Sequence, residues 1–474
     1  MADRSALDAI VVGGGVGGLA TAIRLRAAGH RVTVLERNAV AGGKLAVLER
    51  DGFVFDVGPS LVTLPHVYDE LFRCAGTTLA DEVDLRRLDP QFGYRWRDGR
   101  SLTMRDDGCD EPGYRAFVEH GRQIWDISER TFFAGPMGSP FAMARRMRSP
   151  LDLPRIDPLR TLDASARRFF TDEHMVQWAG RYATYSGSSP YRAPATLGCI
   201  AHVEREYGCW YPIGGLGALR DAFVRVAERI GVEIECSTEV QSITAGAAVD
   251  GVTLADGTWR RADVVVANAD AEHLYRDLLP DASALRTVRR AHPSTSGFVI
   301  VAGVRGATPG IEHHTIWFSG DGRREFDQIA AGRLADEPTV YACVSSRTDA
   351  SQAPAGHENW FLLVNTPAGV DVDRDAYTEV VLRTLEQHGV TLRDRLLFTE
   401  TITPHDLAAR YRAPGGAIYG TSSDGRRAAF VRPANRGARR GLYLVGGSSH
   451  PGGGLPLVTM SARIVADMVQ DDHR

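Results

Sequence analysis

Residues 9–18 read Ala9-Ile10-Val11-Val12-Gly13-Gly14-Gly15-Val16-Gly17-Gly18, and this short stretch decides the fold of the chain. Its apolar, β-branched beginning predicts a buried strand, and the run of glycines that follows predicts a tight turn. Apolar side chains then recur at helical spacing as far as Gly29, and residues 31–35 have the composition of a second strand. The pattern is that of a strand–helix–strand unit, so we expect an α/β fold that begins with a Rossmann-like domain.

The glycines of this turn have the spacing that a bound dinucleotide requires. Gly13 allows the tight turn, Gly15 lets the backbone approach a diphosphate, and Gly18 lets the helix pack on the strand. The diphosphate lies at the start of the helix, where unpaired N–H groups favour an anion. A carboxylate at the end of the second strand can accept hydrogen bonds from a ribose. The candidate contacts in this unit are Gly13, Gly15, Val16, Gly17, Gly18 and Glu36.

A second glycine turn, residues 37–44, directly follows the ribose acid. It resembles the extended signature of the amine-oxidase and phytoene-desaturase group of flavoproteins, in which this turn lies along FAD. That resemblance makes Arg37, Gly43 and Lys44 candidate contacts to phosphate or ribose, and Lys44 is the only lysine of the chain. The alternative is a solvated loop with two surface cations. No second Gly-x-Gly-x-x-Gly follows a strand, so we expect FAD as the cofactor and no separate NADPH site.

Further motifs make the resemblance more specific. They are Phe55-Asp56-Val57-Gly58-Pro59-Ser60, Tyr211-Pro212-Ile213-Gly214-Gly215-Leu216-Gly217 and the tail residues 446–457. The chain resembles the bacterial-type phytoene desaturases from residue 10 to residue 468, and its tail is most similar to the late-acting desaturases of hydroxycarotenoids. The resemblance adds Gly58, Pro59, Ser60, Val240, Gly446, Gly447, Gly454, Leu455, Pro456 and Leu457 as candidate FAD contacts. Gly447 stands where many amine-oxidase relatives carry an acid, so no carboxylate contact is expected there.

The resemblance also implies how the domains are arranged. Residues 1–90, 205–288 and 416–474 form a discontinuous FAD-binding domain, and residues 289–415 form an inserted α+β substrate domain with an antiparallel sheet. Residues 91–204 are expected to form a helical lid that faces a membrane. The aromatic and basic clusters of this lid could seat it among lipid headgroups, or they could belong to an ordinary lid helix. They are Phe132, Phe133, Phe141, Met143 and Arg145-Arg146-Met147-Arg148.

The amino-acid composition restricts the kinds of partner and the cellular location that we expect for this protein. A net charge of −4 without a dominant basic block argues against nucleic acid. The apolar runs are too short to span a bilayer, and a first strand near residue 9 leaves no room for a secretory signal. We therefore expect a cytoplasmic protein, peripheral on the inner face of the cell membrane.

The six cysteines are scattered and expected to be reduced. His313-His314 lacks partners at zinc spacing, so no metal is expected.

The resemblance implies an FAD-dependent enzyme that introduces double bonds into an acyclic, carotenoid-like polyene by hydride transfer to flavin, with oxygen or a membrane quinone as electron acceptor. The sequence nominates no catalytic acid or base. Isomerisation, saturation or terminal oxidation of a polyene stays open on the same fold. An amine oxidase is a weaker alternative, because relatives of that kind use an active-site lysine and Lys44 lies in the cofactor turn. A non-enzymatic escort protein similar to Rab GDP-dissociation inhibitors would not need the intact glycine turn.

Overall fold

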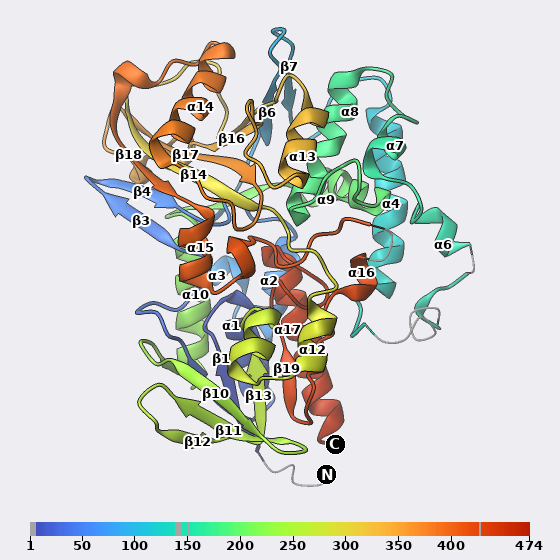
Figure 1. Ribbon diagram of the computed structural model, residues 1–474, viewed down its shortest axis with the longest axis vertical. Helices are drawn as coiled ribbons and strands as arrows, with labels where there is room; N and C mark the ends of the chain where they lie inside the picture. The colour runs from blue at the N-terminus through green and yellow to red at the C-terminus, as the bar shows by residue number, and fades with distance from the viewer. Residues whose placement is uncertain (1–5, 138–144, 150, 426–427) are drawn as a thin grey trace.

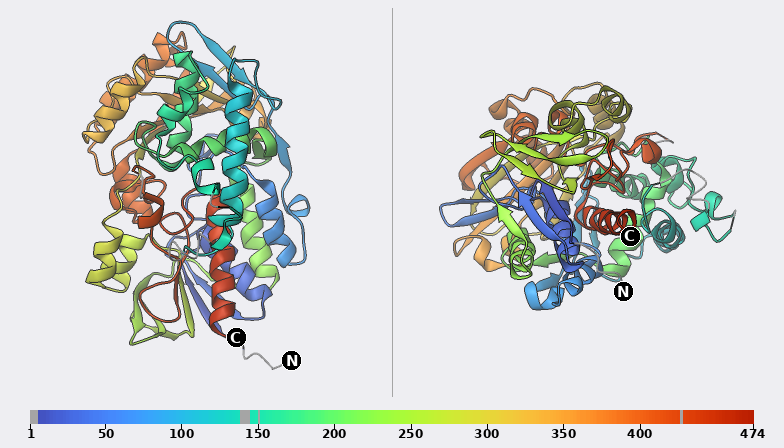
Figure 2. Two further views of the ribbon diagram at one scale, coloured as in Figure 1. Left: turned by 90° about the vertical axis from the view of Figure 1, so that its right-hand side faces the viewer. Right: turned by 90° about the horizontal axis from the view of Figure 1, so that it is seen from below.

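The computed structural model describes residues 6–137, 145–149, 151–425 and 428–474. Two large β-sheets lie one above the other along the long axis of the molecule, and a group of helices lies along one side (Figures 1 and 2). Each sheet combines strands that are far apart in the sequence, so the chain crosses between the two parts of the molecule several times.

The sheet in the lower half of Figure 1 is parallel and has the strand order β19-β13-β1-β2-β9. Its strands are β1 (Asp8–Val12), β2 (Arg31–Leu35), β9 (Glu233–Glu235), β13 (Val264–Ala267) and β19 (Leu442–Leu444). The predicted N-terminal unit is β1, helix α1 (Val16–Ala27) and β2. The α/β fold with a Rossmann-like sheet is thus confirmed, and the sheet joins three separate parts of the chain.

Both faces of the parallel sheet are buried. Alternate side chains of a strand point to opposite faces, so Val11 packs on one side and Ile10 on the other. One face is covered by α1, α2 (Pro65–Cys74), α10 (Leu216–Arg229) and α17 (Leu455–Asp472). The other face is covered by the sheet β10 (Val240–Ala245), β11 (Val249–Leu254) and β12 (Trp259–Arg261). Such double burial explains why these strands are continuously apolar.

The upper sheet has seven strands in the order β18-β14-β17-β16-β15-β6-β7. They are β6 (Phe92–Arg95), β7 (Ser101–Met104), β14 (Ser296–Arg305), β15 (His314–Trp317), β16 (Val340–Cys343), β17 (His357–Thr366) and β18 (Leu396–Ile402). All neighbours are antiparallel except the parallel pair β15–β6. Helix α14 (Arg374–Gln387) packs on the outer face of this sheet.

One boundary differs from the expected arrangement. Residues 92–104 fall in the segment expected to be a helical lid, yet they form strands β6 and β7 of the upper sheet. The helices of that segment begin only at Tyr114. Phe92 and Tyr94 lie in β6 and pack under these helices, so the strand pair joins the helical segment to the sheet. A three- or four-residue strand has too little periodicity to be recognised without its partner strand.

The remaining elements are short or lie at the sides of the two sheets. Helices of the lateral group are α4 (Tyr114–Thr131), α6 (Asp152–Arg155), α7 (Leu162–Ala166), α8 (Glu173–Gly180) and α9 (Cys199–Tyr207). Other elements are β3 (Val47–Arg50), β4 (Phe53–Asp56), α3 (Leu79–Glu82), β5 (Leu85–Arg87), β8 (Trp210–Pro212), α11 (Ala271–His273), α12 (Ala282–Val288), α13 (Gly322–Ala330), α15 (Pro404–Tyr411) and α16 (Ala428–Val431).

Phe141 and Met143 lie outside the described residues. In the part of the chain that the structure describes, every helix is too short or too polar to cross a bilayer.

Candidate functional site

A cavity of about 1070 Å³ lies between the two sheets. The carboxyl ends of the parallel strands β1, β2, β13 and β19 open into it, which is where α/β sheets bind their ligands. Its lining includes Gly13, Gly15, Val16, Gly17, Glu36, Arg37, Gly43, Lys44, Gly58, Pro59, Ser60, Val240, Gly446, Gly447, Gly454, Leu455, Pro456 and Leu457. The structure therefore brings together every candidate cofactor residue except Gly18. Their individual contacts with FAD stay predictions.

The glycine turn forms a cradle that side chains would fill. A Cβ on Gly18 would lie 2.2 Å from the carbonyl oxygen of Gly13, so the start of α1 packs directly on the turn. A Cβ on Gly15 would lie 2.8 Å from Nδ2 of Asn268. Asn268 follows β13 and donates a hydrogen bond from Nδ2 to the carbonyl oxygen of Gly13 at 3.1 Å. The space beside this backbone, at the first turn of α1, fits a diphosphate.

Glu36 has the position expected of the ribose acid. It lines the cavity although only 4 % of its surface is exposed. Backbone N–H groups of Gly14 and Asn38 each donate to its carboxylate at 2.8 Å, and the Asn38 side chain donates at 2.6 Å. These bonds hold the carboxylate oxygens beside the glycine turn.

The two cations of the second glycine turn are already bonded to backbone carbonyls. Lys44 donates from Nζ to the carbonyl oxygen of Ile418 at 2.6 Å. Arg37 donates to the carbonyl oxygens of Ala409 and Arg410, at the end of α15, at 2.7 and 2.6 Å. The surface-loop alternative is wrong for Lys44, which is enclosed in the cavity wall. Both side chains tie this turn to residues 409–418.

Burial lowers the pKa of Lys44 to about 8, against the opposing attraction of Asp270. A large share of the side chain is therefore the neutral, nucleophilic amine near pH 8. Because the chain has no other lysine, acetylation of Lys44 reports on this cavity alone. We expect FAD to slow this acetylation strongly by covering Lys44, as peptide mass spectrometry of loaded and flavin-stripped protein can show. The N-terminal amine is the internal reference, and equal rates with and without FAD would contradict the placement of Lys44 beside the cofactor.

The tail motif positions the first turn of α17 against the cavity. Gly454 has φ +112° and precedes the helix, whose second residue is Pro456, a position that suits proline. His450 lies behind this turn, is buried, and packs against Phe132 with ring centroids 4.6 Å apart. Burial lowers the pKa of His450 to about 4, so the imidazole is neutral. Nε2 of His450 also lies 3.1 Å from the carbonyl oxygen of Gly135.

Beyond the cofactor cradle, the cavity is floored by the upper sheet. Residues at alternate positions of adjacent strands line it, as expected from one face of a pleated sheet. They are Val299 of β14, Ile316 of β15, Tyr341 of β16, and Phe361 and Leu363 of β17, with Phe318 just after β15. Helical residues such as Ile200 and Val203 lie across from this floor. The result is a largely apolar chamber next to the cofactor cradle.

A buried cation lies at the edge of this chamber. Arg181 is 9 % exposed, and its guanidinium carbon lies 4.3 Å from the ring centroid of Phe92. Its counter-ion is Glu204, with Nη1 to Oε1 at 3.6 Å. Glu204 also accepts hydrogen bonds from the hydroxyls of Tyr182, at 2.9 Å, and Tyr185. No signal in the sequence predicted this group, because Phe92, Arg181 and Glu204 lie in separate segments that only the tertiary fold brings together.

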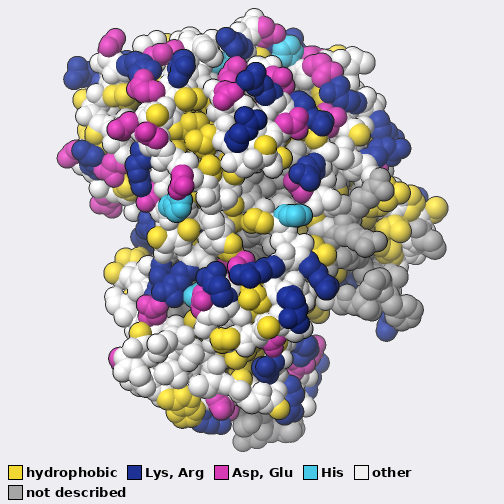
Figure 3. Space-filling view, in the orientation of Figure 1, with side chains coloured by type: hydrophobic (Ala, Val, Ile, Leu, Met, Phe, Trp, Pro, Cys, Tyr) yellow, Lys and Arg dark blue, Asp and Glu magenta, His cyan; other side chains and the backbone are white. Residues whose placement is uncertain are grey.

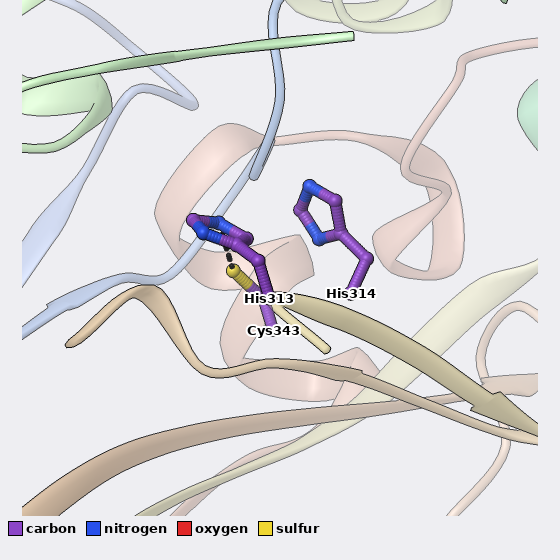
Figure 4. A group of neighbouring side chains, drawn as sticks. All are labelled: His313, His314 and Cys343. Atoms are coloured by element: carbon purple, nitrogen blue, oxygen red, sulfur yellow. Dashed lines mark hydrogen bonds between the residues drawn. The ribbon is translucent and has the colours of Figure 1, made fainter. Parts of the chain in front are cut away.

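The sequence also missed the partners of the two adjacent histidines. Cys343 on β16 lies opposite His314 on β15, and a possible ligand atom from each of His313, His314 and Cys343 lies within 4.8 Å of the others (Figure 4). Both ring nitrogens of His313 have partners, Thr348 Oγ1 at 2.7 Å and Cys343 Sγ at 3.4 Å. In the structure the contacts of His313 are hydrogen bonds, and the absence of a metal stays a prediction.

Comparison with known proteins places this site in a family. The family model of flavin containing amine oxidoreductases matches residues 16–470. A 4,4'-diapolycopene oxygenase of a Methylomonas species is 35% identical, covering 98% of both chains, and a 4,4'-diaponeurosporene oxygenase of Staphylococcus aureus is 32% identical, covering 97% of both. A fatty acid isomerase of P. acnes has a TM-score of 0.66 at 15% identity and covers 99% of both chains.

Putrescine oxidase bound to putrescine also has a TM-score of 0.66, with 14% identity and 98% of both chains covered. At such identities the two solved structures show that the fold is shared, and nothing more. The family model and the two oxygenases span nearly the whole chain, which carries the complete cofactor cradle. The chain therefore belongs to the flavin-containing amine oxidoreductase family, as an FAD-dependent oxidoreductase.

Proposed function

We propose that this protein oxidises an acyclic, carotenoid-like polyene at or near one end of its chain. The observation that carries this proposal is the continuity of one cavity from the FAD cradle into the apolar chamber above the upper sheet. Such a chamber suits a long hydrocarbon, although charged side chains such as Arg167, Glu173 and Arg323 also line the cavity. The names of the two oxygenases that are similar over nearly the whole chain support a substrate of this class.

The reaction that we favour is oxygenation, because both relatives are named as oxygenases, one of 4,4'-diapolycopene and the other of 4,4'-diaponeurosporene. We propose a terminal carbon as its site. FAD, when bound, accepts a hydride from an allylic C–H bond. The chain's part is to hold that carbon against the flavin with apolar contacts from Ile316, Phe361 and Leu363. The positive charge left on the substrate is delocalised along its double bonds, so little electrostatic help is needed from side chains.

Desaturation is the second candidate, and the cofactor and tail motifs that resemble desaturases favour it. It begins with the same hydride loss and ends with loss of a proton from the neighbouring carbon, where oxygenation ends with addition of water. Oxygen or a membrane quinone is the electron acceptor that we propose for either reaction. Amine oxidation is disfavoured because the single lysine is bonded to the Ile418 carbonyl oxygen.

The deciding experiment is anaerobic mixing of the FAD-loaded protein with acyclic carotenoids in liposomes, followed by chromatography of the polyene. Flavin bleaching with an oxygenated, water-derived product would support terminal oxidation, and oxygen-18 water would label it. Bleaching with only an extended, red-shifted polyene would favour desaturation. If oxidised flavin stayed inert while reduced flavin altered the polyene, isomerisation or saturation would replace both.

We also propose that the protein collects its substrate at the inner face of the cell membrane, through a surface on the lateral helices. The structure describes six exposed large hydrophobic side chains, and three of them, Leu151, Leu153 and Leu159, lie within nine residues. Figure 3 shows apolar side chains gathered on the projection at the right, where α6 lies in Figure 1. Arg155 and Arg160 are about half exposed beside them. Leucines flanked by arginines suit the headgroup layer.

Phe132 and Phe133 do not belong to this surface. Phe132 packs on His450, and Phe133 lines the cavity and packs on Trp125. Of the two alternatives for these rings, these contacts favour packing within an ordinary lid helix. Among the described residues of this segment, the exposed large apolar side chains are the three leucines further along the chain.

Replacing Leu151, Leu153 and Leu159 together by serine is expected to weaken binding to anionic liposomes by at least about tenfold. Each leucine contributes roughly 1 kcal/mol or more when it is buried in lipid. Co-sedimentation measures the effect. Leu397→Ser is the matched control, because Leu397 is also exposed but lies on β18. Equal binding of the triple variant and the control would remove this surface from the proposal.

A further inference from the structure

Tyr341 stands out among the side chains of the cavity floor because its hydroxyl is bonded on two sides. The hydroxyl lies 2.5 Å from Oγ of Ser60, in the segment expected beside the flavin, and 2.8 Å from Nδ1 of His314. Tyr341 lies on β16 and His314 on the neighbouring β15, so the pairing of these strands sets their distance. The three residues form a hydrogen-bonded chain from the cofactor cradle to the interior of the sheet.

His314 is placed to receive a proton from Tyr341, because its Nδ1 lies 2.8 Å from the phenolic oxygen. It is fully buried, and its ring stacks on that of Phe92 with centroids 5.1 Å apart. Burial, together with the nearby His313 and Arg181, holds the pKa of His314 well below its ordinary value. The imidazole is therefore neutral and can accept a hydrogen bond at Nδ1. The same shift makes His314 a weak base, so it takes up a proton only from a strongly acidic donor such as the cation left by hydride loss. Nε2 of His314 has no hydrogen-bond partner among the described residues, so the ring is hydrogen-bonded through Nδ1.

The neighbouring groups do not offer the same arrangement. His313 points to Cys343 and is bonded on its other side to Thr348 (Figure 4). Tyr185, which also lines the cavity, gives its hydroxyl hydrogen to Glu204. Tyr341 is thus a cavity-lining phenol beside the cofactor cradle that has a neutral imidazole behind it.

The oxidation of the polyene, on which this inference rests, removes a hydride and a proton in total. The hydride takes the electron pair of the broken C–H bond, so the proton needs a separate acceptor. In oxygenation the proton comes from the water whose oxygen forms the new C–O bond. In desaturation it comes from the neighbouring carbon, whose C–H electron pair forms the new double bond.

We propose that Tyr341 is the catalytic base of this reaction, taking the substrate proton on its phenolic oxygen while its own proton passes to Nδ1 of His314. Ser60 donates to the same oxygen and fixes its direction. The relay serves oxygenation and desaturation alike, because both release one proton near the flavin. His314 is a positioning residue that acts on the substrate through Tyr341.

The test compares Tyr341→Phe with Tyr377→Phe in the FAD-loaded protein. Tyr377 is a buried tyrosine on α14, outside the cavity, and donates to the Ala335 carbonyl oxygen at 3.3 Å. We expect Tyr341→Phe to keep its FAD and to bind the polyene as the wild type does, measured by fluorescence quenching. The rate at which the polyene bleaches the flavin should fall by about 10²-fold, the usual contribution of a general base. Tyr377→Phe should bleach like the wild type.

His314→Asn separates proton transfer from packing. Asparagine can place a hydrogen-bonding group near the position of Nδ1 but cannot take up a proton. We expect bleaching to slow and its solvent deuterium isotope effect to change, with polyene binding retained. A merely structural role for His314 would leave the isotope effect as in the wild type.

Histidine-selective nitrogen NMR tests the relay without any substrate. We expect Nδ1 of His314 to be unprotonated in the wild type and its resonance to move in Tyr341→Phe, while that of His313 stays. A protonated Nδ1, or bleaching of Tyr341→Phe at the wild-type rate, would overturn the proposal. If none of the polyenes bleached the flavin of the wild-type protein, the proposed function would fail. The NMR result would still decide whether Tyr341 donates to His314.

Discussion

Gly15→Val is expected to give a folded protein that has lost most of its affinity for FAD. The backbone of Gly15 has φ −70°, which valine adopts readily, so the conformation itself is not strained. The space is the obstacle, since a Cβ there would lie 2.8 Å from Nδ2 of Asn268 and the valine methyls would enter the cradle. Overpacking costs about 3 kcal/mol, which corresponds to a dissociation constant raised about 10²-fold. The flavin absorbance of the purified protein and titration of the apoprotein with FAD measure it.

The matched control is Gly246→Val. Gly246 lies in the turn between β10 and β11, has no positive φ, and nothing lies within 4 Å of a Cβ built on it. We expect this variant to keep its flavin and its melting temperature. Stoichiometric FAD in Gly15→Val would show that the diphosphate does not approach this turn.

Glu204→Leu is expected to lower the free energy of unfolding by about 3–5 kcal/mol, because it leaves Arg181 as a buried charge without its counter-ion. It also removes the acceptor of the Tyr182 and Tyr185 hydroxyls. Glu204 is 2 % exposed, so water cannot replace the carboxylate without opening the helical group. The apparent melting temperature and the urea midpoint of the apoprotein measure the loss.

Two controls separate the charge from the volume of the side chain. Glu206→Leu changes an exposed carboxylate of the same helix, α9, and is expected to melt like the wild type. Arg181→Met combined with Glu204→Leu removes both charges and is expected to regain most of the lost stability, since an apolar pair of similar volume often replaces a buried ion pair without loss. If Glu204→Leu alone melted like the wild type, the ion pair would have no stabilising role.

The local order of the cofactor domain could be predicted from the sequence. The glycine turn, the helix after it and the second strand form from neighbouring residues, and each has its own signal in glycine, apolar spacing or β-branching. Hairpin β3–β4, which turns at Asp51-Gly52, and helix α10 are likewise formed by neighbouring residues. Such elements are visible in the sequence because their hydrogen bonds close over a few residues.

The groups between elements could not be predicted in this way. Asn268 contacts Gly13 across 255 positions of the chain, and Tyr341 lies 281 positions from Ser60. Strands β6 and β7 join the upper sheet only because β15 offers them a parallel edge. Neither the spacing nor the composition of a segment carries information about which distant strand will pair with it.

The sequence by itself determined that the chain is an α/β protein with an N-terminal dinucleotide cradle, and it located the residues from which that cradle is made. The tertiary structure alone decided what lies around the cradle: the apolar floor, the ion pair of Arg181 and Glu204, and the contact of Tyr341 with His314. The physical reason is that a turn is specified by the conformations of its own residues, whereas a pair of side chains on adjacent strands is specified by the register of the sheet.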